Sequence, residues 1–169
     1  MISQKMESAI NKQISEELYS AYLYSAMGNY FDSINLRGFA HWMRLQTDEE
    51  LAHARKFRDY LLNRGGKVVL TEIKGPKNEW ESPLAVFEAS YRHECHISEC
   101  INKLSSLSQK ENDHASHAFL EWFVEEQVEE EANVDNVVQQ LKLVKDSPGA
   151  LFMLDRELGA RQAAAPAEG

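Results

Sequence analysis

An acid and a histidine interrupt the apolar stripe of one predicted helix. Residues 48–54 read DEELAHA, which places Glu50 and His53 three residues apart on one helical face. The same face continues to Phe39 in one direction and to Phe57 in the other. Carboxylates and imidazoles are common ligands of divalent transition metals. The pair therefore indicates a candidate metal site on the core side of this helix.

The other three long predicted helices also carry acids within their apolar stripes. These acids are Glu17, Glu94 and Glu130, and Gln127 precedes Glu130 by one turn. The spacing repeats along the chain. Glu17 and Glu50 are 33 residues apart, and so are Glu94 and Gln127. Two helical hairpins built alike would bring these side chains to one level of a bundle.

Acids at four core positions need a partner that neutralises them. A single charged residue near an apolar stripe usually reaches solvent or pairs with lysine or arginine. No lysine or arginine lies in these four stripes near the acids, and a buried unpaired carboxylate is costly. Two divalent cations would balance the four charges, with His53 as a neutral ligand. An oxygen-rich set with one imidazole and no thiolate favours Fe(II) or Mn(II) over a structural zinc site.

Long stretches with few glycines and prolines predict the elements that position these side chains. We expect helices over residues 4–33, 36–64, 83–109, 114–145 and 148–160. Gly65-Gly66 ends the second helix. Ser82, Asp113 and Ser147 are the expected N-caps of the last three. Each long helix must bury an apolar stripe against its neighbours, and a four-helix bundle satisfies that need.

The linker over residues 65–81 decides how the helices connect. When extended, it can span ~55 Å, which is the whole length of a bundle. The third helix can therefore start at the end opposite to the end of the second. We expect an all-α four-helix bundle over residues 1–145 with this long crossover, a short C-terminal helix within residues 146–160, and a disordered tail over residues 161–169.

The composition fits one globular domain and excludes some partners. Hydrophobic residues make up 43% of the 169 residues, and the net charge is −9. This charge argues against binding to nucleic acid or an anionic membrane. We expect no signal peptide and no membrane span, since no apolar run is long enough for either. Cys95 and Cys100 would point roughly 140° apart on a helix, so no disulfide and a reducing, cytoplasmic location are expected.

Four parts of the chain resemble the ferritin family, specifically its non-haem bacterial and archaeal members. They are EELYSAYLY at 16–24, EELAHA at 49–54, Glu94, and FLEWFVEEQVEEE at 119–131. The resemblance covers nearly the whole chain. It implies a ferritin-like four-helix bundle with a short fifth helix, and a homo-oligomer that is usually a hollow shell of 24 subunits.

The resemblance also implies a ferroxidase centre for two iron ions. Carried over residue by residue, the first iron site takes Glu17, Glu50 and His53. The second takes Glu50, Glu94 and Glu130, with Gln127 beside them.

Further positions match features near that centre in the family. Glu49, Glu126 and Glu129 match the third iron site of the bacterial type. Tyr24 matches the tyrosine next to the centre. It either supplies an electron or holds a hydrogen bond.

The fourth helix separates this chain from related families. Bacterioferritins have a second Glu-x-x-His, where this chain has Gln127 and Glu130. Their haem-ligating methionine follows the glutamate that corresponds to Glu50, and that place holds Leu51, so no haem is expected. Rubrerythrins add a cysteine-rich iron domain, which two cysteines cannot form.

The resemblance implies iron storage, in which oxygen or hydrogen peroxide oxidises Fe(II) at the centre and ferric mineral collects inside the shell. Two other interpretations stay open. One is a di-iron peroxidase or oxygenase with another substrate, which would need a substrate pocket and an electron donor. The other is a helical scaffold whose acids are incidental or hold a structural metal.

Two histidine clusters carry weaker signals. His93, His96 and Cys100 lie at i, i+3 and i+7 and could bind zinc or copper, but a fourth ligand is missing. We therefore expect a solvated helix face there. His114 and His117, near the start of the fourth helix, could line an ion pore, although a surface position is expected.

Overall fold

Helices make up the regular structure of the described residues, which are 1–145 and 147–163 of this computed structural model. They are α1 (Gln4–Ser33), α2 (Arg37–Asn63), α3 (Pro83–Lys110), α4 (His114–Leu143) and α5 (Pro148–Leu158). The predicted boundaries agree with these to within two residues. None of the five is both long and apolar enough to cross a bilayer.

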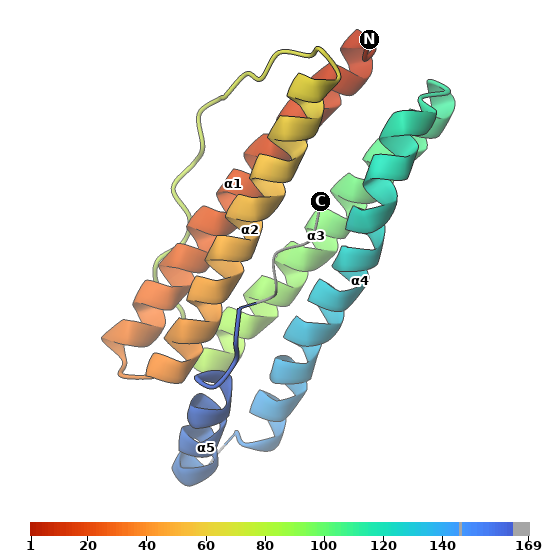
Figure 1. Cartoon of the computed structure of the whole chain (residues 1–169). Coiled ribbons are helices and arrows are strands. Elements are labelled where there is room, and N and C mark those ends of the chain that lie inside the picture. The colour runs from red at the N-terminus through yellow and green to blue at the C-terminus, as the bar shows by residue number, and fades with distance from the viewer. Residues whose placement is uncertain (146, 164–169) are drawn as a thin grey trace.

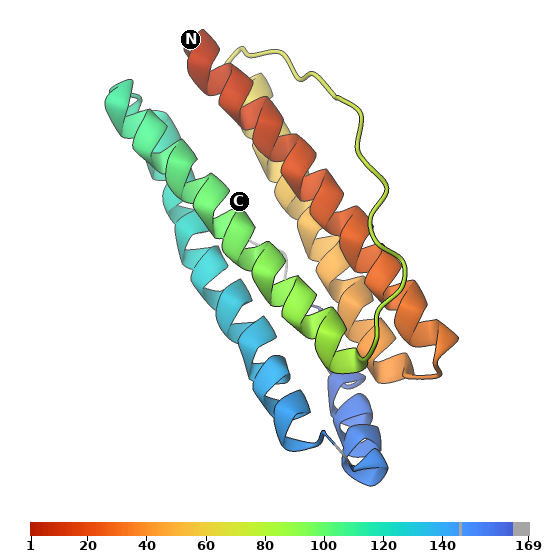
Figure 2. The same cartoon turned by 180° about the vertical axis from the view of Figure 1, so that it is seen from behind.

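The four long helices form a bundle of two antiparallel hairpins (Figure 1). α1 packs closely along α2, and α3 packs along α4. The segment from residue 64 to residue 82 runs the length of the bundle (Figures 1 and 2). As a result, α3 begins at the end where α1 turns into α2. This arrangement confirms the predicted all-α bundle with a long crossover and a short fifth helix.

The predicted N-caps are present. The side chains of Ser82, Asp113 and Ser147 each accept a hydrogen bond from the backbone N–H three residues later, at 3.1–3.3 Å. Pro83 and Pro148 occupy the first helical positions, where no N–H is needed. Each cap satisfies a donor that the helix itself cannot pair. The sequence therefore fixes where these three helices begin.

Asn11 on α1 holds the crossover against the bundle. Its side-chain amide donates to the Lys67 carbonyl oxygen at 2.9 Å, and its Oδ1 atom accepts from the Val69 N–H at 2.7 Å. The hydroxyls of Ser15 and Thr71 lie 3.2 Å apart one turn further along. The crossover therefore follows α1, as Figure 2 shows.

The core of the bundle consists of two separate apolar clusters. One surrounds Phe31, Phe39 and Phe87, at the end that carries the α1–α2 turn and α5. The other surrounds Phe57 and Phe123, towards the opposite end. A layer of buried polar side chains lies between the two clusters along the helices. The apolar clusters fix the helices on both sides of this layer.

α5 is tied to the start of α2. Leu154 and Leu158 are buried, and the Asp155 Oδ1 atom accepts hydrogen bonds from the N–H groups of Gly38 at 2.8 Å and Phe39 at 3.0 Å. Asp155 thus caps α2 from a distance, where the residue before α2 provides no side-chain cap. A Cβ on Gly38 would lie 1.6 Å from the Asp155 carbonyl oxygen, so this contact requires glycine.

Arg161, the first residue of the predicted tail, packs against α2. Its guanidinium donates to Glu49 at 3.0 Å and to the Gln46 side chain, and it lies over the Trp42 ring at 4.9 Å. Arg161 thus has an ion pair and an aromatic contact at the start of the predicted tail, and the expected disorder of the tail stays a prediction. Residues 164–169 of the predicted tail lie outside the described residues.

The capping of α2 by Asp155 gives a prediction about the stability of the protein. Asp155→Ala should lower the free energy of unfolding by about 1 kcal/mol, because two N–H groups of α2 lose their acceptor. Urea denaturation followed by circular dichroism measures the change. Glu157→Ala is the matched control, since it removes an exposed carboxylate from the same helix. Equal stability of the two variants would contradict the capping role.

Candidate metal centre

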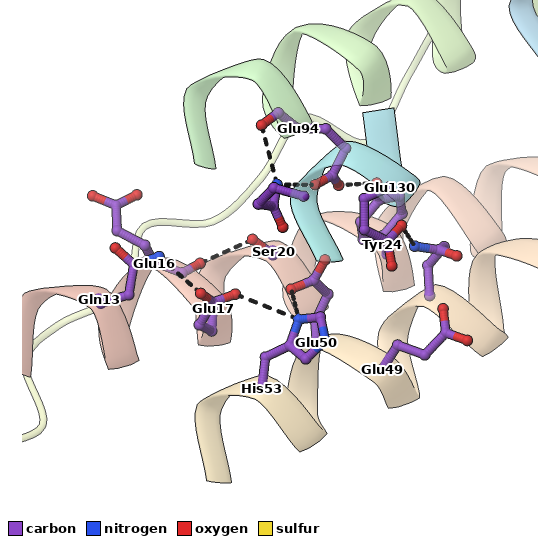
Figure 3. A network of polar contacts seen from close by, with 12 residues as sticks. Gln13, Glu16, Glu17, Ser20, Tyr24, Glu49, Glu50, His53, Glu94 and Glu130 are labelled. Atoms are coloured by element: carbon purple, nitrogen blue, oxygen red, sulfur yellow. Dashed lines mark hydrogen bonds and ion pairs between the residues drawn. The ribbon is translucent and has the colours of Figure 1, made fainter. Parts of the chain in front are cut away.

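The polar layer between the apolar clusters brings together side chains from all four long helices. Its members are buried, and they are Gln13, Glu17, Ser20, Tyr24, Gln46, Glu50, His53, Ser90, Glu94, Gln127 and Glu130. The layer contains every residue predicted for the two iron sites. The prediction that two similar hairpins place these groups at one level therefore agrees with their positions (Figure 3).

Glu17, Glu50 and His53 form the tightest group. One ligand atom from each lies within 4.8 Å of the others. His53 Nδ1 is 3.5 Å from Glu50 Oε2 and 4.0 Å from Glu17 Oε2 (Figure 3). Neither of these two buried oxygens has a hydrogen-bond partner. Unpaired buried carboxylate oxygens are costly unless a cation joins them, so this group fits a divalent metal.

Neighbouring side chains fix the orientation of this group. Gln13 donates to the other oxygen of Glu17 at 2.8 Å, which leaves Oε2 free to face the histidine. The His53 ring packs edge-on against Trp122 and Phe123, with ring centroids 5.6 and 5.8 Å apart. These contacts restrict the plane of the imidazole ring, and its Nδ1 atom faces Glu17 and Glu50.

Glu94 from α3 and Glu130 from α4 are also buried in the layer and accept hydrogen bonds from neighbouring side chains. Tyr24 donates to Glu94, and the Gln127 amide donates to the same carboxylate at 3.2 Å. The Gln46 amide donates to Glu130 at 2.7 Å. These donors hold both carboxylates towards the centre. Together with Glu50, the two acids could hold a second cation.

Burial raises the pKa of every acid in the layer. Desolvation is the largest cause, and neighbouring carboxylates add to it. The pKa of Glu130 rises from 4.5 to about 8, through desolvation and the charge of Glu94. The pKa values of Glu17 and Glu50 lie well above 4.5, and that of Glu94 is also raised. Protons must therefore neutralise part of the layer at neutral pH whenever cations do not.

Tyr24 is fully buried beside Glu94. Its hydroxyl also lies 2.9 Å from the Ser90 hydroxyl, and desolvation and the charge of Glu94 raise its pKa well above 10.0. The side chain is therefore a neutral hydrogen-bond donor. This geometry fits a role in which Tyr24 positions Glu94.

The residues predicted for a third iron site do not converge as closely. In residues 1–145 and 147–163, two groups of three potential ligands have donor atoms within 4.8 Å, and neither contains Glu49, Glu126 or Glu129. Glu49 pairs instead with Arg161 at 3.0 Å, and Glu129 is exposed. Glu126 is half-buried, and the charges of Glu129 and Glu49 contribute to its raised pKa. The three acids share one side of the centre without a common point.

Two polar residues that support the centre were not predicted as part of it. Gln46 links Glu130 to the Arg161 guanidinium, so one cation does approach the layer from outside the helices. Gln13 orients Glu17. Both glutamines lie in the apolar stripes of their helices, one turn before an acid. That spacing is the signal that could have identified them.

The histidines outside the layer have different surroundings. His93 Nε2 lies 2.7 Å from the Ser20 hydroxyl, and burial lowers the pKa of this histidine to about 4. His114 is exposed and His117 is half-buried, with Nε2 3.9 Å from Glu121. The expected surface position is therefore correct for His114 and only partly correct for His117.

The raised pKa values predict how the stability of the iron-free protein depends on pH. Folded Glu130 keeps its proton up to about pH 8, whereas the unfolded chain releases it near 4.5. The folded state therefore binds more protons, and the free energy of unfolding contributed by this group falls as the pH rises through that window. Glu130→Gln removes this contribution. Urea midpoints measured in chelator should fall more steeply with pH for the wild type, and parallel curves would contradict the assignment.

Comparisons with known proteins agree with this geometry. The family profile described as Ferritin-like domain matches residues 7–144. A bacterial non-heme ferritin of Bacteroides fragilis is 42% identical over 161 residues, which cover 95% of this chain and 100% of that protein. A bacterial non-heme ferritin of Staphylococcus saprophyticus is 35% identical over 161 residues, covering 95% of this chain and 96% of that one.

Solved structures give the same result. The open pore ferritin of the archaeon Archaeoglobus fulgidus is 49% identical with a TM-score of 0.95, and the match covers 96% of this chain and 100% of that one. A closed form engineered from the same ferritin is 48% identical with a TM-score of 0.96, covering 97% and 100%. With the profile, the relatives and the carboxylate layer in agreement, the chain belongs to the ferritin family.

Proposed function

We propose that this protein stores iron and oxidises Fe(II) at the polar layer. The observation that supports this most directly is the pair of buried carboxylate oxygens without partners, on Glu17 and Glu50, facing His53 Nδ1. Membership of the ferritin family supports iron binding and storage. Fe(II) is the substrate here, and the bundle is the scaffold that holds it.

The first Fe(II) ion would bind to Glu17, Glu50 and His53. This set supplies oxygen atoms and one nitrogen atom, which Fe(II) accepts readily. Two carboxylates balance the charge of one divalent ion, and the histidine adds a neutral ligand. Because Glu17 and Glu50 have raised pKa values, binding releases any protons they carry.

The second Fe(II) ion would bind to Glu94 and Glu130, with Glu50 shared between the two ions. Gln127 donates to Oε2 of Glu94 and Gln46 donates to Oε2 of Glu130, so these amides help to position both carboxylates. Tyr24 adds a further donor to Glu94. In this role the tyrosine is a positioning residue.

Oxidation of two Fe(II) ions supplies two electrons. That number reduces one oxygen molecule to hydrogen peroxide, or one hydrogen peroxide molecule to water, with two protons taken up in either case. The acids that hold the two ions are ionised, so these two protons are taken up from solvent. Transfer of the Fe(III) product to a store completes the proposed turnover.

The rest of the proposal concerns what surrounds the centre. Glu49, Glu126 and Glu129 would form a third iron site once Glu49 exchanges Arg161 for iron. Twenty-four copies would enclose the ferric mineral in a hollow shell, in the cytoplasm. The family relationship supports these points, and the expected absence of haem stays a prediction.

Ligand removal tests the centre. Glu50→Ala and His53→Ala should each slow aerobic Fe(II) oxidation by at least roughly 10–100-fold, because each removes a ligand of the first ion. Stopped-flow absorbance of the ferric product measures the rate, and gel filtration measures the assembly, which should not change. Asp48→Ala is the matched control, since Asp48 is an exposed acid on the same helix. If both variants oxidised Fe(II) at the wild-type rate, the polar layer would not be the site of oxidation.

Aerobic addition of many equivalents of Fe(II) to the wild-type protein separates the remaining interpretations. Storage predicts a soluble ferric core in a large particle after many equivalents of Fe(II). A di-iron oxygenase would turn over two irons in a small oligomer. A scaffold would oxidise none above the rate of the buffer.

A further inference from the structure

A second group of potential metal ligands lies outside the buried layer, between α1 and α3. It consists of Glu16 from α1 with His96 and Cys100 from α3, and one donor atom from each lies within 4.8 Å of the others. Glu16 and Glu17 are consecutive residues of α1, so their side chains leave the helix in different directions. The carboxylate of Glu16 points away from that of the buried Glu17 (Figure 3). The group is therefore separate from the proposed iron centre.

The distances within this group match those of a tetrahedral zinc site. His96 Nε2 lies 3.2 Å from Glu16 Oε2 and 3.7 Å from Cys100 Sγ. Zinc–ligand bonds at tetrahedral angles would place a nitrogen and an oxygen about 3.3 Å apart, and a nitrogen and a sulfur about 3.6 Å apart. The His96–Glu16 and His96–Cys100 pairs are thus already spaced as one zinc ion would hold them, and the third pair of donors lies within 4.8 Å.

Protons alone do not satisfy this arrangement. One imidazole nitrogen, Nε2 of His96, faces both Glu16 and Cys100. If Nε2 carries a proton, it can donate well to the carboxylate, and the sulfur is left with a weak contact. If Nε2 is unprotonated, it can accept from the thiol, but its lone pair then faces a carboxylate. A cation at the common point would be favourable for all three donors.

The neighbouring histidine does not belong to the group. His93 is engaged with the Ser20 hydroxyl at 2.7 Å, and its ring packs edge-on against Tyr19. The expected solvated face is therefore wrong for His93, which is hydrogen-bonded to Ser20, whereas His96 is exposed. α1 supplies the carboxylate that replaces His93, and residues 80 positions apart in sequence meet only in the folded chain.

We propose that Glu16, His96 and Cys100 bind one zinc ion, with water as the fourth ligand. Glu16 and Cys100 are half-buried and His96 is exposed, so both the ion and the water can reach the site. Cys100 loses its thiol proton to solvent on binding, and the carboxylate and thiolate then balance the two positive charges of the ion. A thiolate ligand favours zinc over Fe(II). The ion would join α1 of one hairpin to α3 of the other.

Cobalt(II) replaces zinc as the probe, because a cobalt–thiolate bond gives a charge-transfer absorption that carboxylates and imidazoles cannot give. Full-length protein with reduced cysteines, under argon, should bind one Co(II) ion per chain with this absorption, and Zn(II) should displace it. The buried iron centre contains no thiolate, so Co(II) bound there does not contribute to the signal.

Three variants decide the assignment. Cys100→Ser should abolish the absorption, and Cys95→Ser should leave it unchanged, because Cys95 lies on the same helix outside the group. His96→Ala should weaken Co(II) binding at least ~10-fold. This second variant tests the proposal independently if Cys100→Ser folds poorly. No thiolate absorption in the wild type, or an unchanged signal in Cys100→Ser, would overturn the proposal. Loss of the signal in Cys95→Ser would do so as well.

Discussion

One constraint, the free-energy cost of burying ionised carboxylates, determines how the rest of this protein is built. Four glutamates lie in a layer where the helices exclude water, and each ionised carboxylate there costs several kcal/mol without a partner. The raised pKa values of the four acids express that cost. Two of their oxygens, on Glu17 and Glu50, have no hydrogen-bond partner among the described residues. A layer of this kind is unfavourable in the empty protein and becomes favourable when cations enter, which is the property that an iron-binding centre needs.

The fold makes that layer tolerable. Apolar clusters on both sides of it hold the helices together, with aromatic rings such as Phe31 and Phe87 at one end and Phe57 and Phe123 at the other. Because packing stabilises the bundle at both ends, the middle can remain polar. Hydrogen bonds from Gln13, Gln46 and Gln127 then orient the carboxylates without neutralising them. Charge balance is thus left to metal ions and protons.

Much of this could be predicted from the sequence, because helical periodicity is local. The apolar stripes and the caps at Ser82, Asp113 and Ser147 identify the helices, and the crossover length identifies the topology. The equal spacing from Glu17 to Glu50 and from Glu94 to Gln127 predicts the layer. Contacts between distant segments could not be predicted in this way. Asp155 capping α2, Arg161 reaching Glu49, and Glu16 joining His96 all depend on the packing of helices whose relative rotation has no local signature.

The central claim is that the layer binds iron in pairs, and the most direct measurement is the anomalous X-ray scattering of crystals soaked in ferrous salt under argon. The account predicts two iron peaks per chain, one contacting Glu17, Glu50 and His53, and the other contacting Glu94 and Glu130. It also predicts that both peaks are lost when Glu50 is replaced by alanine. A layer without iron, or carboxylates turned towards solvent in the soaked crystal, would contradict the account.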